Sequence, residues 1–90
     1  MDHIQETLET PDGWTHEGNE LVRAIDTATY AQGVELTLQI ANLADAMNHH
    51  PEIVLTYSQV RISVSSHDVG AVTGRDIVFA HAANTLISEI

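Results

Sequence analysis

The chain has 90 residues and no cysteine. Its formal net charge is −10, because it has 13 acidic residues but only three arginines and no lysine. This length predicts a single domain over residues 1–90 with a thin core, and the charge makes binding to nucleic acid or to an anionic membrane unexpected. The lack of cysteine excludes a disulfide framework and a thiolate site, and an N-terminus without an apolar export segment predicts a cytoplasmic protein.

The first third of the chain predicts a β-hairpin. Periodic apolar residues are few before the breaker run at 11–13, so a short helix is expected there at most. Gly18-Asn19 is a two-residue pair of the kind that closes β-hairpins. It separates residues 14–17 from residues 20–25, and we predict that these two segments pair.

The next segment predicts a long helix over residues 28–48, capped by Asp26 or Thr27. Its apolar residues fall into two rows at three- and four-residue spacing. A stripe of this width exceeds what one sheet face needs, which predicts that a partner subunit covers part of it. The first row is Tyr30, Val34, Leu38, Ala41 and Ala44, and the second row is Leu36, Ile40, Leu43 and Met47.

Two strands are predicted after Pro51, which ends the helical region. The strands cover residues 53–58 and 60–66. In the second strand, apolar residues at 60, 62 and 64 alternate with polar ones, as in a sheet with one buried face and one wetter face.

A final helix is predicted over residues 73–88, because Thr73 and Asp76 have the spacing of a capping box. Antiparallel strands with helices inserted between them predict an α+β fold, with an antiparallel sheet of about four strands and the helices packed on one face. The apolar row of the last helix is Ile77, Ala80, Ala83 and Ile87.

Histidines are the candidate functional residues, since the chain has six of them. His49 and His50 are weak evidence alone, because histidines at the end of a helix also interact favourably with its dipole. His67 adds weight, since it ends a strand just before a loop, where sites are commonly built. If the two predicted strands pair in the sheet that the long helix covers, His67 and the His49-His50 corner come to the same edge.

A spaced run of polar residues extends this pattern. Asp45 is followed after three residues by His49-His50-Pro51, then after five by Tyr57, after nine by His67 and after eight by Asp76. In this order and spacing the run resembles the signature of the pterin-4a-carbinolamine dehydratase family. The resemblance covers roughly residues 14–87, which makes it more specific than any single short motif.

The resemblance implies a lyase that removes water from a 4a-hydroxytetrahydropterin to give the quinonoid dihydropterin. The reaction needs an acid for the leaving hydroxyl and a base for the N5 proton, and histidine can supply either at neutral pH. The family's catalytic residues carry over to His49, His50 and His67, with the acid and the base unassigned. Its pterin-holding positions carry over to Asn48, Ser65 and Ser66. The family usually has Thr in place of Ser66.

Other residues of the signature are expected to support the site. Asp45 lies one helical turn before His49 and could orient an imidazole, or it could be a solvated surface carboxylate. Asp76 is interpreted first as a helix cap, Pro51 as the residue that fixes the turn, and Tyr57 as a packing residue. Three histidines lie outside the pattern and are expected at the surface or in packing: His3, His16 and His81.

Several interpretations stay open. The resemblance implies a pterin substrate, no cofactor, a homodimer or homotetramer, and a functional link to an aromatic amino-acid hydroxylase. The main alternative is a non-catalytic dimerisation or scaffold protein on the same fold, and a third is an acidic domain with incidental histidines. A metal site of three histidines is the chemical rival, but adjacent residues seldom converge on one ion and no fourth ligand is evident, so no metal is expected.

Overall fold

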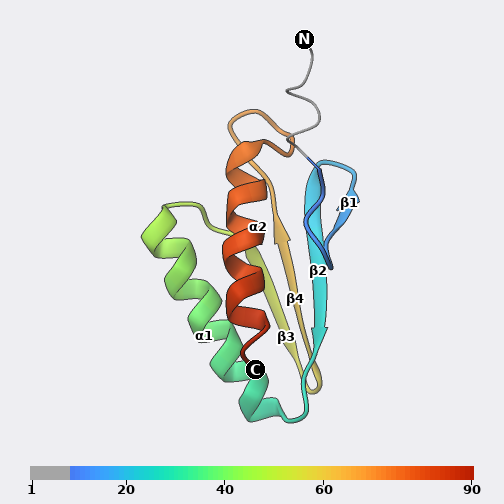
Figure 1. Cartoon of the computed structure of the whole chain (residues 1–90), viewed down its shortest axis with the longest axis vertical. Coiled ribbons are helices and arrows are strands. Elements are labelled where there is room, and N and C mark those ends of the chain that lie inside the picture. The colour runs from blue at the N-terminus through green and yellow to red at the C-terminus, as the bar shows by residue number, and fades with distance from the viewer. Residues whose placement is uncertain (1–8) are drawn as a thin grey trace.

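A computed structural model describes residues 9–90 and contains one four-stranded antiparallel sheet and two helices (Figure 1). Both helices lie on the same face of the sheet, so the predicted α+β fold is confirmed. The sheet order is β1-β2-β4-β3, which makes β1 and β3 the edge strands. The elements are β1 (Thr15–Glu17), β2 (Glu20–Asp26), α1 (Tyr30–Met47), β3 (Glu52–Thr56), β4 (Gln59–Val64) and α2 (Gly74–Ile87).

The N-terminal hairpin forms at the predicted pair. Glu17 pairs with Glu20, and Gly18 between them has a φ of 60°, a left-handed conformation that glycine adopts without steric cost. The short helix predicted at the start of the chain falls largely on residues 1–8, which lie outside the described residues.

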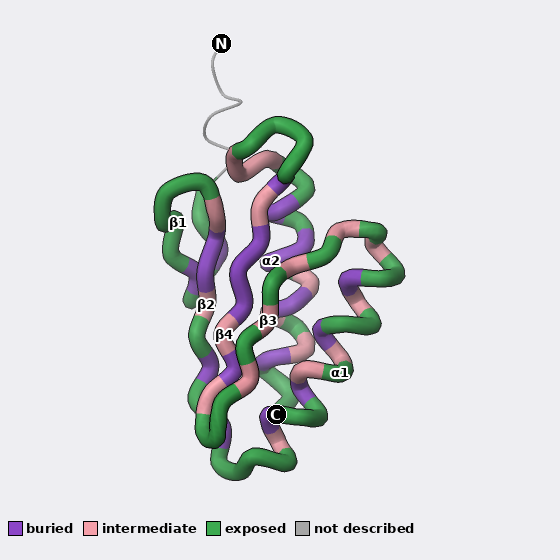
Figure 2. The backbone as a smooth tube through the Cα atoms, turned by 180° about the vertical axis from the view of Figure 1, so that it is seen from behind, coloured by how far each residue is buried: buried purple, intermediate pink, exposed green. Residues whose placement is uncertain are grey.

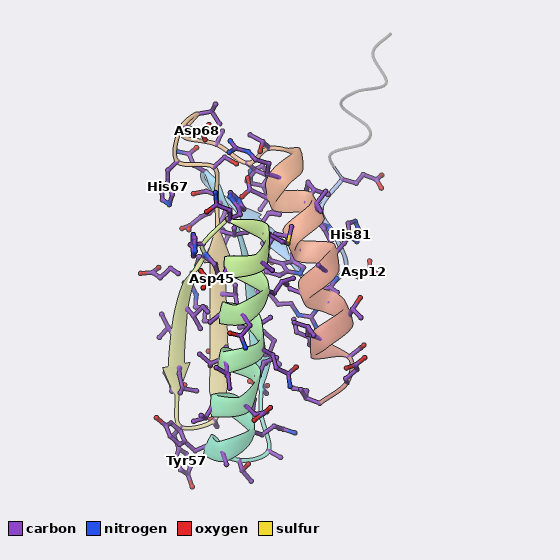
Figure 3. The ribbon with its side chains drawn as sticks, turned by 90° about the vertical axis from the view of Figure 1, so that its left-hand side faces the viewer. Asp12, Asp45, Tyr57, His67, Asp68 and His81 are labelled. Atoms are coloured by element: carbon purple, nitrogen blue, oxygen red, sulfur yellow. The ribbon has the colours of Figure 1, made fainter. Side chains whose placement is uncertain are left out.

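The hairpin of β3 and β4 differs in detail from the prediction. Thr56 pairs with Gln59, so the turn is Tyr57-Ser58 and the strands are shorter than expected. The side chain of Tyr57 is 83% exposed at the tip of this hairpin, at the opposite end of the molecule from His67 (Figure 3). The packing role expected for Tyr57 is therefore wrong for the single chain.

The cap of α1 differs from the prediction, whereas the cap of α2 agrees with it. Thr29, rather than Asp26 or Thr27, caps α1, and its hydroxyl accepts from the Gln32 amide at 3.0 Å. Asp26 instead ends β2. Helix α2 begins as predicted, with Thr73 as its cap and a reciprocal capping box to Asp76.

The core lies between the sheet and the helices, with most buried residues on β2, β4 and the inner sides of α1 and α2 (Figure 2). The predicted row of α2 is buried throughout. In α1 the second predicted row faces the sheet, with Leu36 and Ile40 fully buried. The first row is divided, because Tyr30, Val34 and Leu38 are 49%, 45% and 55% exposed, whereas Ala44 at its end is buried.

Candidate functional site

The end of α1 turns the adjacent histidines out of the helix. Asn48 has φ 53° and ψ 43°, a left-handed conformation that asparagine tolerates better than most residues. The Asn48 amide donates to the Asp45 carbonyl at 3.1 Å and the His49 amide donates to the Ala44 carbonyl at 3.0 Å, which satisfies two carbonyls of the last helical turn. The chain therefore leaves α1 directly into His49 and His50.

The sheet register brings this corner to the end of β4. Strands β3 and β4 are antiparallel, with Glu52 opposite Ser63. The residues just before β3 therefore run alongside those just after β4, which are Ser65, Ser66 and His67. Figure 3 shows Asp45 and His67 on the same side of the molecule.

A buried carboxylate links three segments at this edge. Asp76 is fully buried, and its Oδ1 lies 2.6 Å from Nε2 of His49. Its Oδ2 accepts from the Ser66 hydroxyl and from the Thr73 amide, each at 2.8 Å. In the tautomer that carries its proton on Nε2, His49 donates to this carboxylate, and Nδ1 is left out of the contact. Asp76 thus orients an imidazole as well as capping α2.

The His49 ring is largely buried. Its side chain is only 12% exposed. The ring of Phe79 meets it edge-on, with the ring centroids 6.4 Å apart and the planes at 72°. Hydrogen bonds in such a low-dielectric site are stronger than in water, so the contact with Asp76 holds the imidazole firmly.

His50 is oriented in a more exposed setting. Its Nε2 lies 2.9 Å from Oδ1 of Asp45, and the two side chains are 60% and 82% exposed. Asp45 therefore orients the imidazole of His50. An exposed pair of this kind contributes about 0–1 kcal/mol, so His50 is held less firmly than His49.

His67 lies on an exposed turn over residues 67–70. The turn is closed at its base, where the Ser66 amide donates to the Ala71 carbonyl at 3.0 Å. The amides of Val69 and Gly70 donate to the Ser66 carbonyl at 3.1 and 2.8 Å. A hydrogen bond from Arg75, 2.6 Å from Asp68, holds the pKa of the Asp68 carboxyl below its usual value of 3.8.

The two serines expected to hold a pterin lie in different environments. Ser66 is fully buried, and its hydroxyl contacts Asp76 and Thr73, each at 2.8 Å. It supports the carboxylate from behind and cannot present its hydroxyl to a ligand, contrary to our expectation. Ser65 is half-buried at the same edge.

The histidines outside the pattern lie elsewhere. His16 belongs to β1, and Figure 3 shows His81 on α2, on the opposite side of the view from His67. His3 lies outside the described residues.

A cavity of about 410 Å³ opens between the end of α1 and the start of α2. Its volume is in the range typical of small-molecule sites. His49 is part of its wall, whereas His50 and His67 are not, so a ligand that touches all three imidazoles must extend from the cavity onto the open edge. Arg75 is a wall residue that the sequence pattern did not single out. The cavity is lined by Met47, Asn48, His49, Gly74, Arg75 and Val78.

Two further findings hold for residues 9–90 alone. No group of three or more histidine and acidic side chains is placed there to hold a metal ion. No helix in this part of the chain is long and apolar enough to cross a membrane.

Sequence comparisons match nearly the whole chain. The family model described as pterin 4 alpha carbinolamine dehydratase matches residues 1–86. A relative from Roseiflexus castenholzii is 33% identical over 84 residues, which cover 93% of this chain and 90% of the relative. A relative from Halobacterium salinarum is 37% identical over 70 residues, or 78% and 77% of the two chains. Both relatives carry a provisional assignment as pterin-4-alpha-carbinolamine dehydratases.

Two solved structures share the fold. A protein from Brucella melitensis, described as a transcriptional coactivator/pterin dehydratase, has a TM-score of 0.80 at 25% identity and covers 97% of this chain and 92% of its own. A pterin dehydratase-like protein, identified as a RuBisCO assembly factor in the alpha-carboxysome, has a TM-score of 0.72 at 20% identity, with 83% and 89% covered. The second likeness concerns the fold alone.

Proposed function

This chain belongs to the pterin 4 alpha carbinolamine dehydratase family, and on that premise we propose that it removes water from a 4a-hydroxytetrahydropterin to give the quinonoid dihydropterin. One observation carries the proposal. The buried carboxylate of Asp76 lies 2.6 Å from Nε2 of His49 and fixes the ring beside a cavity, at the edge where His50 and His67 also lie. An imidazole fixed in this way is suited to proton transfer to or from a bound ligand.

The reaction is a dehydration without redox change. The bond between C4a and its hydroxyl oxygen breaks with its electron pair, and the oxygen takes a proton from an acid and leaves as water. N5 gives its proton to a base, and the C4a=N5 double bond forms. The pterin is the substrate, so the mechanism calls for no cofactor.

The proposed catalytic residues are His49, His50 and His67. At neutral pH an imidazole can act in either protonation state, so one ring can donate while another accepts. Asp76 orients His49 and Asp45 orients His50, each through Nε2. Asn48 and Ser65 are proposed to hold polar edges of the pterin, because Asn48 lines the cavity and Ser65 lies at the end of β4.

Histidine substitutions test this assignment. His50→Ala and His67→Ala should each lower the rate of enzymatic dehydration at least about tenfold, since a well-placed proton transfer is worth roughly 10²–10⁴-fold. The matched control is His81→Ala, because His81 lies on the far side of the molecule on α2. Equal losses in all three variants would mean that the edge histidines have no special role.

The proposal extends to the setting of the enzyme. We expect a homodimer or homotetramer that acts in the cytoplasm and regenerates pterin for an aromatic amino-acid hydroxylase. The outward apolar row of Tyr30, Val34 and Leu38 supports self-association, because such a surface is costly to leave in water.

A second candidate is a non-catalytic scaffold or dimerisation protein. The same exposed row on α1 favours it, and a protein of this fold is a RuBisCO assembly factor. The assay of dehydration separates the two candidates, since a scaffold leaves the spontaneous rate unchanged.

A further inference from the structure

Two short contacts connect the start of α2 to the proposed site, one at the His67 turn and one at His49. His67 is followed by Asp68, and Arg75 is followed by Asp76. Nη2 of Arg75 lies 2.6 Å from Oδ1 of Asp68, and Oδ1 of Asp76 lies 2.6 Å from Nε2 of His49. A continuous path therefore runs from the turn of His67 through the first turn of α2 to the ring of His49.

The turn of His67 depends on this path for its orientation. Backbone hydrogen bonds from Val69 and Gly70 to the Ser66 carbonyl, and from Ser66 to Ala71, join the turn to its own base, and none of them reaches α2. Within residues 9–90, the contact between Asp68 and Arg75 is the one side-chain hydrogen bond that joins the turn at 67–70 to another element. Without it, the exposed tip would be fixed only through its base.

Arg75 is the cation suited to this task. The chain has three arginines against 13 acidic residues. Arg23 donates to Asn84 and Arg61 donates to Ser63, whereas Arg75 makes the short ion pair. Arg75 also lines the cavity beside His49, so the tether passes along the wall of the proposed site.

We infer that Arg75 and Asp68 are positioning residues, which hold the His67 turn against α2 and keep its imidazole aimed at the edge occupied by His49 and His50. This inference rests on the proposed function. An exposed ion pair adds little to folding stability, so its loss should act on the reaction rather than on the fold. A misplacement of about 1 Å can cost up to about 10²-fold in rate, which sets the scale of the effect.

The kinetic test compares Arg75→Gln and Asp68→Asn with Arg61→Gln, which removes the same charge on the open face of the sheet. Arg75→Gln and Asp68→Asn should each lower kcat about tenfold with KM nearly unchanged, and the double variant should lose no more than either single one. Arg61→Gln should keep its kcat. In a His67→Ala background, Arg75→Gln should have no further effect.

Two outcomes would overturn the inference. If Arg75→Gln lowered kcat by the same factor with and without His67, Arg75 would not act through His67. If it mainly raised KM, Arg75 would contact the substrate itself.

A second measurement does not depend on turnover. Amide hydrogen exchange at Val69 and Gly70, whose amides donate to the Ser66 carbonyl, should become faster in Arg75→Gln but not in Arg61→Gln. Unchanged exchange would overturn the tether even in an active enzyme. A wild-type protein without dehydratase activity would instead refute the proposed function while this measurement still decided the tether.

Discussion

Nε2 of His49 lies 2.6 Å from Oδ1 of Asp76, although the two residues are 27 positions apart in the chain. The same carboxylate accepts a hydrogen bond from the Thr73 amide and so completes the cap of α2. The start of a helix and the orientation of an imidazole therefore depend on one buried side chain. A substitution there should affect stability and activity together, and a second variant can separate the two effects.

Asp76→Asn should lower kcat at least about tenfold and destabilise the fold by about 1–3 kcal/mol, because the amide cannot accept from every donor that surrounds the carboxylate. Urea unfolding and steady-state kinetics measure the two effects. Thr73→Ala is the control, since it removes the other half of the cap without touching His49, and it should cost about 0.5–2 kcal/mol while kcat is kept. If both variants lost the same small share of kcat, Asp76 would be only a cap.

Asn48→Gly should separate a backbone role from a ligand role at the end of α1. Asn48 has a φ of 53°, which glycine adopts freely, whereas Asn48→Ala should cost about 1 kcal/mol. If the Asn48 side chain holds the pterin, Asn48→Gly should fold as well as the wild type yet show a KM raised several-fold. A wild-type KM in a stable Asn48→Gly protein would remove Asn48 from the substrate-binding set.

The pH dependence of the reaction should follow the histidines. The hydrogen bond from Arg75 lowers the pKa of Asp68 below 3.8, so the stability that this carboxylate contributes is present above that value and is lost only as the pH falls through the lower folded-state pKa. The tether is therefore ionised between pH 5 and 8, where an imidazole titrates. We expect one or two breaks of kcat in that range. A profile that stays flat there and changes only below pH 4 would point to carboxylates instead.

Leu38→Glu should weaken self-association, because Leu38 is 55% exposed in the outward row of α1. In the single chain, a charge at this exposed position stays hydrated at little cost. In an apolar interface the same charge would lose its hydration, which is costly. Light scattering at micromolar concentration should give a dimer or tetramer for the wild type and a smaller particle for the variant. A monomeric wild type would contradict the expected assembly, and an unchanged variant would move the interface away from this row.

Local signals in the sequence predicted most of the fold. The spacing of Thr73 and Asp76 marked the start of α2, and the row that begins at Ile77 marked its buried side. The Gly18-Asn19 pair marked a turn. These features depend on neighbours within a few residues, so the sequence reveals them directly.

Features that depend on distant partners were less visible. Two apolar rows on α1 looked equivalent, and only the position of the sheet decides that Leu36 is buried and Leu38 exposed. The pairing of His49 with Asp76 depends on the register of β3 on β4 and on the position of α2, neither of which the spacing specified. The ion pair of Asp68 with Arg75 likewise requires the turn at 67–70 to fold back onto α2.

The most direct test is a stopped-flow measurement of the breakdown of a synthetic 4a-hydroxytetrahydropterin, with and without the wild-type protein. We expect a marked acceleration over the spontaneous rate by protein purified without added metal, and chelator treatment should leave that rate unchanged, because imidazoles suffice for both proton transfers. A rate equal to that of buffer alone would contradict the dehydratase function and favour the scaffold. Stoichiometric metal, with activity lost on chelation and regained on its return, would replace the histidine mechanism by a metal-assisted one.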